Sequence, residues 1–315
     1  MRYRLSAYIA LIIVLFIVLS GCSSAKTLNI AIILSGDSQD FSNSILQGAK
    51  AAAEEMDIKL TYKITAKGTS ISKQAMFIDS LAEDGTDALV IYPLEYQKIN
   101  HKLKELNIPV AVINSLPTSE INGGKNSYLY TDPTETGELM AHSFIEKLDR
   151  GSQIAAILPN MTNSIVMKQL DTMKDILAEN NIYVAEVTLD SEDTLTVHKE
   201  ISTFMMEHPY IKAIAAFDST AVEGGAEAIS QQDKDIFIVS ADASITTVSY
   251  LEKGIVHTAI IQSPFSIGYL GVQNAIKMAK GEDVPHITSL RPRRVTLENL
   301  FDPDIEKQIF PFQVP

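Results

Sequence analysis

The polar side chains that could bind a ligand in this sequence lie directly after runs of apolar residues. They are carboxylates, amides and hydroxyls, with Phe41, Phe217 and Phe265 close by. Carboxylate and amide oxygens accept hydrogen bonds from hydroxyl and amine groups, and aromatic faces cover apolar ring faces. This chemistry suits a sugar, a polyol or another small polar molecule. The set lies at residues 35–42, 93–95, 114–115, 131–132, 160–163, 218–219, 242–243 and 262–265.

The apolar runs before these residues are expected to be β-strands. They lie at residues 28–34, 88–92, 109–113, 128–130, 153–158, 183–189, 213–217, 236–240 and 256–261. Residues 59–65, which alternate between apolar and polar, are expected to be a further strand. Segments with apolar residues at helical spacing separate them, at residues 42–56, 71–83, 96–105, 133–148, 164–179, 195–207, 220–231, 245–252 and 266–280. Continuous apolar strands that alternate with amphipathic helices predict parallel sheets covered by helices on both faces.

The number of strands predicts an α/β protein of two similar lobes, each a parallel sheet flanked by helices. One open sheet would be overfilled by so many strands. Ligands of open parallel sheets bind beyond the carboxyl ends of the strands, which is where the polar side chains lie. We therefore expect the ligand to bind in a cleft between the two lobes.

The start of the chain is typical of an export signal. Arg2 and Arg4 precede an almost unbroken apolar run at residues 7–19, and small residues follow it up to Cys22. That layout predicts a secretory signal peptide over residues 1–21. The run is too short for a comfortable membrane span, which needs ~20 apolar residues.

Cys22 is the only cysteine in the chain, and it follows Ser20 and Gly21. The sequence resembles the lipobox of bacterial lipoproteins, which implies that Cys22 becomes the new N-terminus and carries a lipid. Residues 22–27 would then form a short tether. The alternative is an ordinary cysteine after a signal anchor. A single cysteine leaves no disulfide framework within the chain.

The charge of the chain argues against two classes of partner. The sequence has 26 Lys and Arg against 39 Asp and Glu, a net charge of −13, and removal of residues 1–21 takes away two arginines and no acid. Nucleic-acid binders gather Lys and Arg into patches, and anionic membranes attract basic segments. We expect no nucleic-acid partner, and membrane contact only through the lipid.

Signatures of common enzyme classes are missing from the sequence. It has no Gly-rich phosphate loop, no His-Glu-x-x-His and no serine nucleophile elbow. Its six histidines are scattered without metal-ligand spacing. We expect a protein that is not an enzyme and that has no cofactor and no metal site.

From about Leu28 onward the sequence resembles the type I periplasmic binding proteins of ABC importers, in particular their ribose- and galactose-binding branch. The matching elements occur in the family's order, at residues 30–35 through Phe41 to 47–49, 91–93, 107–110, 131–132 with Gly137, 240–242, and 261–262 with 267–268.

This resemblance implies two lobes joined by a three-crossover hinge, with the ligand trapped when the hinge closes. The N-terminal lobe would comprise residues 28–131 and 263–290. The C-terminal lobe would comprise residues 132–262 and 291–315.

Carried over position by position, the resemblance implies six ligand-binding residues: Gln39, Phe41, Asn114, Asp218, Asp242 and Gln262. Five of them, all but Gln39, have a structural alternative. Phe41 would cover the core, and the two aspartates would cap helices. Asn114 and Gln262 would hold the hinge backbone.

Two departures from the family pattern bear on the ligand. The sugar-binding members usually carry Asp-Arg after the fourth strand, where this chain has Asn114 and Ser115. They also carry an arginine near the start of the helix that here begins at residue 164, and residues 164–168 contain none. A guanidinium would fix sugar hydroxyls in a bidentate way. The missing arginines therefore argue against ordinary ribose or galactose as the ligand, and the alternative is a ligand with an amine or a modified sugar.

The function expected from these features is that of a lipid-anchored solute-binding protein on the extracytoplasmic face of the cell membrane. It would capture a sugar-like ligand and deliver it to the permease of an ABC importer. The alternative is a sensor that presents its ligand to a membrane receptor or histidine kinase. A transcription regulator of the same fold would need a DNA-binding headpiece where this chain has an export signal.

Overall fold

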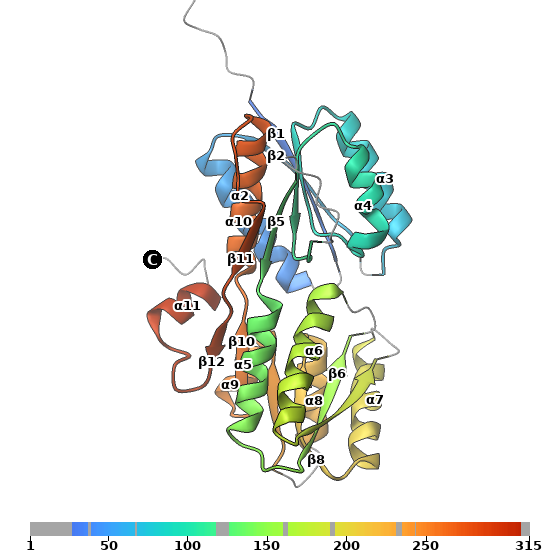
Figure 1. Ribbon diagram of the computed structural model, residues 1–315, viewed down its shortest axis with the longest axis vertical. Coiled ribbons are helices and arrows are strands. Elements are labelled where there is room, and N and C mark those ends of the chain that lie inside the picture. The colour runs from blue at the N-terminus through green and yellow to red at the C-terminus, as the bar shows by residue number, and fades with distance from the viewer. Residues whose placement is uncertain are drawn as a thin grey trace, which may run out of the picture.

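The computed structural model describes residues 27–36, 39–66, 68–117, 126–159, 163–189, 193–230, 235–242 and 244–309. Figure 1 shows two α/β lobes stacked along the long axis of the molecule. Each lobe contains one six-stranded sheet. The predicted architecture of two similar α/β lobes, each a mainly parallel sheet flanked by helices, is confirmed.

The sheet of the first lobe is parallel throughout. Its strand order is β11-β5-β4-β3-β1-β2. The strands are β1 (Asn29–Leu34), β2 (Lys59–Ile64), β3 (Ala88–Ile91), β4 (Val110–Ile113), β5 (Asn126–Thr131) and β11 (Ile287–Leu290).

The sheet of the second lobe has the corresponding order, β12-β10-β9-β8-β6-β7. Its pairs are parallel except the last, because β12 runs antiparallel to β10. The strands are β6 (Gln153–Leu158), β7 (Tyr183–Thr188), β8 (Ile211–Ala216), β9 (Phe237–Ser240), β10 (Val256–Ile261) and β12 (Arg293–Val295).

Both faces of each sheet are buried, which explains the unbroken apolar runs. In β1, Ile30 and Ile32 belong to one core cluster and Ala31 and Ile33 to another. Successive side chains of a strand point to opposite faces. A strand covered on both sides must therefore be apolar at every position.

Helices cover these faces in pairs and triplets. In the first lobe, α2 (Gln39–Glu55) and α10 (Pro264–Ala279) pack on one face, and α3 (Ile71–Glu83) and α4 (Tyr96–Glu105) on the other. In the second lobe, the two faces are covered by α5 (Pro133–Ile145) with α6 (Ser164–Glu179), and by α7 (Thr194–Glu207), α8 (Ser219–Ser230) and α9 (Ile245–Glu252).

Glycines allow the helices that follow two of the crossovers to pack very closely. A Cβ on Gly268 of α10 would lie 1.9 Å from the carbonyl oxygen of Ile45 in α2, and a Cβ on Gly48 would lie 1.9 Å from that of Phe265. In the second lobe, a Cβ on Gly137 of α5 would lie 2.5 Å from the carbonyl oxygen of Gln169 in α6. In both lobes two helix backbones therefore lie in close contact, α10 against α2 in the first lobe and α5 against α6 in the second.

Three elements near the C-terminus were not predicted from the sequence: β11, β12 and α11 (Pro303–Ile309). The two strands lie at sheet edges, and β11 alternates between exposed and half-buried residues. These strands have only four and three residues, so they show neither the apolar run of a central strand nor the longer alternating pattern of the edge strand β2. Ile305 anchors α11 in the core of the second lobe.

Within the described part of the chain, no helix is both long and apolar enough to span a membrane.

Candidate functional site

The chain passes between the lobes three times, and these crossovers fix how the two sheets face each other. The carboxyl end of β5 leads into α5 of the second lobe, and that of β10 leads into α10 of the first lobe. The third crossover joins β11 to β12. The strands of each sheet run parallel to β5 or β10, apart from the edge strand β12, which is antiparallel to β10. The carboxyl edge of each sheet is therefore turned toward the other lobe (Figure 1). This pair of edges is the candidate ligand site.

Hydrogen bonds tie the first and third crossovers together. The Oδ1 atom of Asp132 accepts from the backbone N–H of Thr134 at 2.9 Å and caps α5. The backbone N–H of Asp132 donates to the carbonyl of Leu290 at 2.8 Å. Burial raises the pKa of the neighbouring Tyr130 phenol, and the Asp132 carboxylate raises it further.

Phe41 lies in the first turn of α2, at the carboxyl edge of the first sheet. Its ring meets the ring of Tyr92 edge to face, with centroids 6.3 Å apart. Tyr92 directly follows β3, so two aromatic side chains from different elements meet at this edge. Gln39 begins α2, and its side chain lies outside the described residues.

Asn114 directly follows β4 and has an unusual backbone for a buried residue. Its φ is +50°, its side chain is 6% exposed, and its N–H donates to the carbonyl of Leu129 at 2.8 Å. The buried Oδ1 atom has no hydrogen-bond partner among the described residues. Asn114 therefore keeps a buried acceptor available at the carboxyl edge of the first sheet.

Asp218 follows β8 and performs the capping role that was its alternative. Its Oδ1 atom accepts from the backbone N–H of Ala221 at 2.8 Å, at the start of α8. The carboxylate is half-buried.

Asp242 is the centre of a hydrogen-bond cluster at the start of α9. Its Oδ2 atom accepts from the N–H of Ser244 at 3.0 Å, from the Ser244 hydroxyl at 2.6 Å and from the Thr247 hydroxyl at 2.5 Å. The backbone N–H of Asp242 donates to the Ser240 hydroxyl at 3.0 Å. The three bonds to the carboxylate end on Oδ2. The N-cap of α9 is Ser244, whose hydroxyl accepts from the N–H of Thr247 at 3.2 Å, so the capping role expected as the alternative for Asp242 belongs to Ser244, and Asp242 supports that cap.

Gln262 links the second crossover to the neighbouring strand. Its Nε2 atom donates to the carbonyl of Ala241 at 3.2 Å, beside Asp242. Its own carbonyl accepts from Gln308 of α11 at 3.4 Å, and Gln308 also donates to the Ser263 hydroxyl at 2.5 Å. The hinge role proposed as its alternative is thus present in the structure.

The six predicted residues fall into two groups, one in each lobe. Asp218, Asp242 and Gln262 follow adjacent strands, because β9 lies between β8 and β10. Phe41 and Asn114 lie at the opposite edge, with Gln39 beginning the helix of Phe41. The hydrogen bonds and the ring contact given above join each of the five residues other than Gln39 to a partner in its own lobe.

Sequence reasoning missed Gln74 of α3. Its side chain is 0% exposed, its Nε2 atom donates to the carbonyl of Tyr92 at 3.1 Å, and its Oε1 atom accepts from the N–H of Leu94 at 3.1 Å. The available signal was an amide on the apolar face of a helix, one turn before the core residue Ile78.

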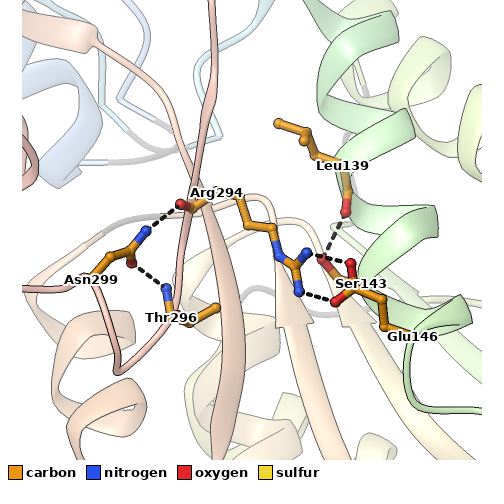
Figure 2. A network of polar contacts seen from close by, with 6 residues as sticks. All are labelled: Leu139, Ser143, Glu146, Arg294, Thr296 and Asn299. Atoms are coloured by element: carbon orange, nitrogen blue, oxygen red, sulfur yellow. Dashed lines mark hydrogen bonds and ion pairs between the residues drawn. The ribbon is translucent and has the colours of Figure 1, made fainter.

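Arg291, Arg293 and Arg294 form a basic cluster near the last crossover, and Arg294 has a structural role. The guanidinium of Arg294 on β12 donates to both carboxylate oxygens of Glu146, at the end of α5, over 2.6 Å and 2.5 Å (Figure 2). Asn299 accepts from the N–H of Thr296 at 2.8 Å and donates to the Arg294 carbonyl at 3.1 Å. The hydrogen bonds from Arg294 lower the pKa of Glu146. This guanidinium binds a carboxylate of the protein itself.

Two further expectations concern metal and lipid. Over the described ranges, no group of three or more His, Cys, Asp or Glu side chains could hold a metal ion. Cys22 lies outside the described residues, as does the whole predicted signal peptide.

Curated relatives resemble the chain over most of its length. The ribose import binding protein RbsB of Bacillus subtilis is 23% identical over 267 residues, which cover 84% of this chain and 86% of that protein. RbsB of Escherichia coli is 22% identical over 275 residues, covering 85% and 91%. These relatives are named as binding proteins rather than enzymes.

Solved structures share the fold. A carbohydrate transporter solute-binding protein from Agrobacterium radiobacter, in complex with D-arabinose, has a TM-score of 0.81 at 20% identity and covers 91% of this chain and 100% of its own. GanP, a glucose-galactose binding protein from Geobacillus stearothermophilus, has a TM-score of 0.77 at 21% identity, covering 88% and 100%. The profile of the periplasmic binding protein domain family matches residues 30–283, and the chain therefore belongs to that family.

Proposed function

We propose that this protein captures a sugar or a closely related polar molecule between its two lobes and delivers it to an ABC importer. The observation that carries the proposal is the arrangement of the two carboxyl edges. Each edge is turned toward the other lobe, and each carries polar side chains that directly follow strands. Family membership supports a binding role, and the relatives named above are sugar-binding or ribose-import proteins.

The proposed contacts are those expected from the sequence: Gln39, Phe41, Asn114, Asp218, Asp242 and Gln262. Phe41 would cover an apolar sugar face, and the amides and carboxylates would bind hydroxyl groups. Two lobes, proposed as residues 28–131 with 263–290 and 132–262 with 291–315, would close on the ligand about the three crossovers.

A thermal-shift screen tests the binding role. The panel contains D-ribose, D-arabinose, D-galactose, D-fucose, D-allose, glycerol and D-glucosamine. A ligand at a hundred times its Kd stabilises the folded state by roughly 2.7 kcal/mol, so a true ligand raises the unfolding temperature by several degrees. Isothermal titration then checks for one site per chain. A panel without any stabilising compound would contradict the sugar-binding proposal.

Lipid anchoring through Cys22 is a separate proposal with its own test. It is supported by the signal layout at residues 1–21 and by the lone cysteine after two small residues. In cells grown with labelled palmitate, the wild-type protein should take up label and stay with the membrane fraction. Cys22→Ser should lose both properties, whereas unchanged labelling of this variant would refute the anchor.

The sensor remains the second candidate, because capture of a ligand is common to both functions. Deleting the protein separates them. Loss of uptake of the radiolabelled ligand indicates import, whereas normal uptake with a lost transcriptional response to the ligand indicates sensing.

A further inference from the structure

We propose that Gln74 is a positioning residue of the ligand site: it fixes the backbone after β3 so that Tyr92 and Phe41 present their rings to the ligand. The inference rests on the proposed sugar-binding function and extends it to a residue behind the binding surface.

The side-chain amide of Gln74 makes two hydrogen bonds to the backbone of residues 92–94, and we call this pair of bonds the Gln74 clamp. Its amide donates to the carbonyl of Tyr92 and accepts from the N–H of Leu94, both at 3.1 Å. The segment lies between the end of β3 and the start of α4, at the carboxyl edge of the first sheet. The donor and the acceptor of one buried amide group therefore both bind the backbone that follows β3.

Gln74 binds the backbone at the point where the hydrogen bonds between β3 and β1 end. The last ladder bond of this strand runs from the N–H of Tyr92 to the carbonyl of Ile33 at 2.8 Å. Residue 93 is a buried proline, which has no N–H to donate. Gln74 supplies the next two hydrogen bonds, so the path of the segment depends on a side chain from another helix.

The segment carries one half of the aromatic pair at the site. The Tyr92 ring meets the Phe41 ring at 6.3 Å with an interplanar angle of 67°. A shift of the Tyr92 backbone would therefore displace the ring contact and change the surface offered to a sugar face. This is the physical link from Gln74 to ligand affinity.

Charge explains why the substitution Gln74→Glu is a sharp test. A carboxylate still accepts from Leu94, but it cannot donate to the Tyr92 carbonyl, and the two oxygens repel. A protonated carboxyl group restores the donor. Because burial raises carboxyl pKa values, to about 8–9 in documented cases, titration between about pH 5 and about pH 9 should switch the clamp.

The experiment measures the Kd of D-ribose, D-arabinose, D-galactose and D-glucosamine by isothermal titration across this pH range, with thermal unfolding at each pH. We expect Gln74→Glu to bind at least roughly tenfold more weakly than the wild type at the alkaline end, as for a buried polar group left unpaired, and to recover wild-type affinity at the acid end. Gln74→Leu should bind weakly at every pH. Gln47→Glu, an exposed position on α2, controls for the added charge and should follow the wild type.

Two results would overturn the inference. If Gln74→Glu lowers the unfolding temperature but binds like the wild type at every pH, Gln74 has only a structural role, and the proposed function stands. If the wild type binds none of these four sugars and none of the other compounds of the thermal-shift panel, the proposed function fails together with the inference.

Discussion

At the scale of single residues, Asn114 combines two costly features. Its φ is +50°. Two other non-glycine residues also have a positive φ, Asp57 at 49° and Asn181 at 57°. Asp57 and Asn181 are exposed and lie in turns that follow α2 and α6, where a left-handed residue commonly ends a helix. Asn114 follows a strand and is buried, and its Oδ1 atom is unpaired among the described residues. Strained, unsatisfied residues of this kind are concentrated at functional sites.

Replacing Asn114 by glycine should separate stability from binding. Glycine adopts positive φ readily and removes the unpaired acceptor, so the free energy of unfolding should stay equal or rise, by up to about 1 kcal/mol. Ligand affinity should fall. Asn181→Gly is the matched control and should leave affinity unchanged. Urea denaturation and titration calorimetry give both numbers, and a strongly destabilised Asn114→Gly would show that Oδ1 has a structural partner.

Asp242→Ala should reduce both stability and binding. Loss of the carboxylate that binds Ser244 and Thr247 at the start of α9 should cost about 1–3 kcal/mol, as for hydrogen bonds to a charged group. Ligand affinity should fall at least tenfold because Asp242 is one of the proposed ligand contacts. Asp193, the N-cap of α7, is the control: Asp193→Ala should lose stability and keep affinity. Unchanged affinity in Asp242→Ala would remove this residue from the proposed site.

The sequence predicted that the candidate residues follow strands, but not how their atoms are used. An aspartate after an apolar run is compatible with a ligand contact and with a helix cap. In the structure Asp218 caps α8, whereas Asp242 binds Ser244, which is the N-cap of α9. The φ of Asn114 and the two-ended clamp of Gln74 depend on neighbours far away in the chain. Local sequence patterns do not encode such contacts.

At the scale of elements, the close crossing of α2 and α10 should tolerate no side chain at its centre. Gly268→Ala places a Cβ 1.9 Å from the Ile45 carbonyl oxygen, and backbone cannot move away easily. Gly271→Ala places one 3.1 Å from Ile113 Cγ2, and a side chain can adjust. We expect Gly268→Ala to destabilise by roughly 1–3 kcal/mol or more, and Gly271→Ala by clearly less. Equal unfolding midpoints in urea would contradict this packing.

The ion pair between β12 and α5 should make a small contribution that depends on pH. Arg294 lowers the pKa of Glu146 in the folded state, so the stabilisation is present above the unfolded value of about 4.3 and is lost as the pH falls through the lower folded value. The pair is partly exposed, so the gain at neutral pH should stay below about 1 kcal/mol.

Glu146→Gln tests that contribution. Its difference from the wild type in free energy of unfolding should be present at neutral pH and shrink in acid. Glu138→Gln, at an exposed position on the same helix, controls for the change of charge. A difference that grows on acidification would have the wrong sign for this ion pair.

Elements with buried faces were the ones that the sequence predicted well. Each strand from β1 to β10 overlaps a predicted range, although β5 and β8 begin two residues before theirs. The central strands were marked by apolar runs, because burial on both faces demands such runs. β11, β12 and α11 escaped prediction, whereas the longer edge strands β2 and β7 did not. β11 and β12 have four and three residues and are held by pairing with β5 and β10, and α11 is held by single anchors such as Ile305.

At the scale of the whole molecule, ligand should make the protein more compact. The lobes are joined by crossovers and carry their polar residues on facing edges, so closure brings those edges together (Figure 1). Small-angle X-ray scattering should give a smaller radius of gyration with saturating ligand than without it, and Asp242→Ala should not respond at the same ligand concentration. An unchanged radius in the wild type would show binding without closure.

The order in which the chain is made has a consequence for the first lobe. Residues from α5 through β10 are continuous, so most of the second sheet is present as soon as they have emerged from the ribosome. The first lobe, although made earlier, lacks α10, which packs against α2, β1, β3, β4 and β5. Until residues 264–290 arrive, an apolar face that includes Ile45 and Val90 stays uncovered. We therefore expect the first lobe to complete its fold only after residues 264–290 have been made, although its first strand is made before those of the second lobe.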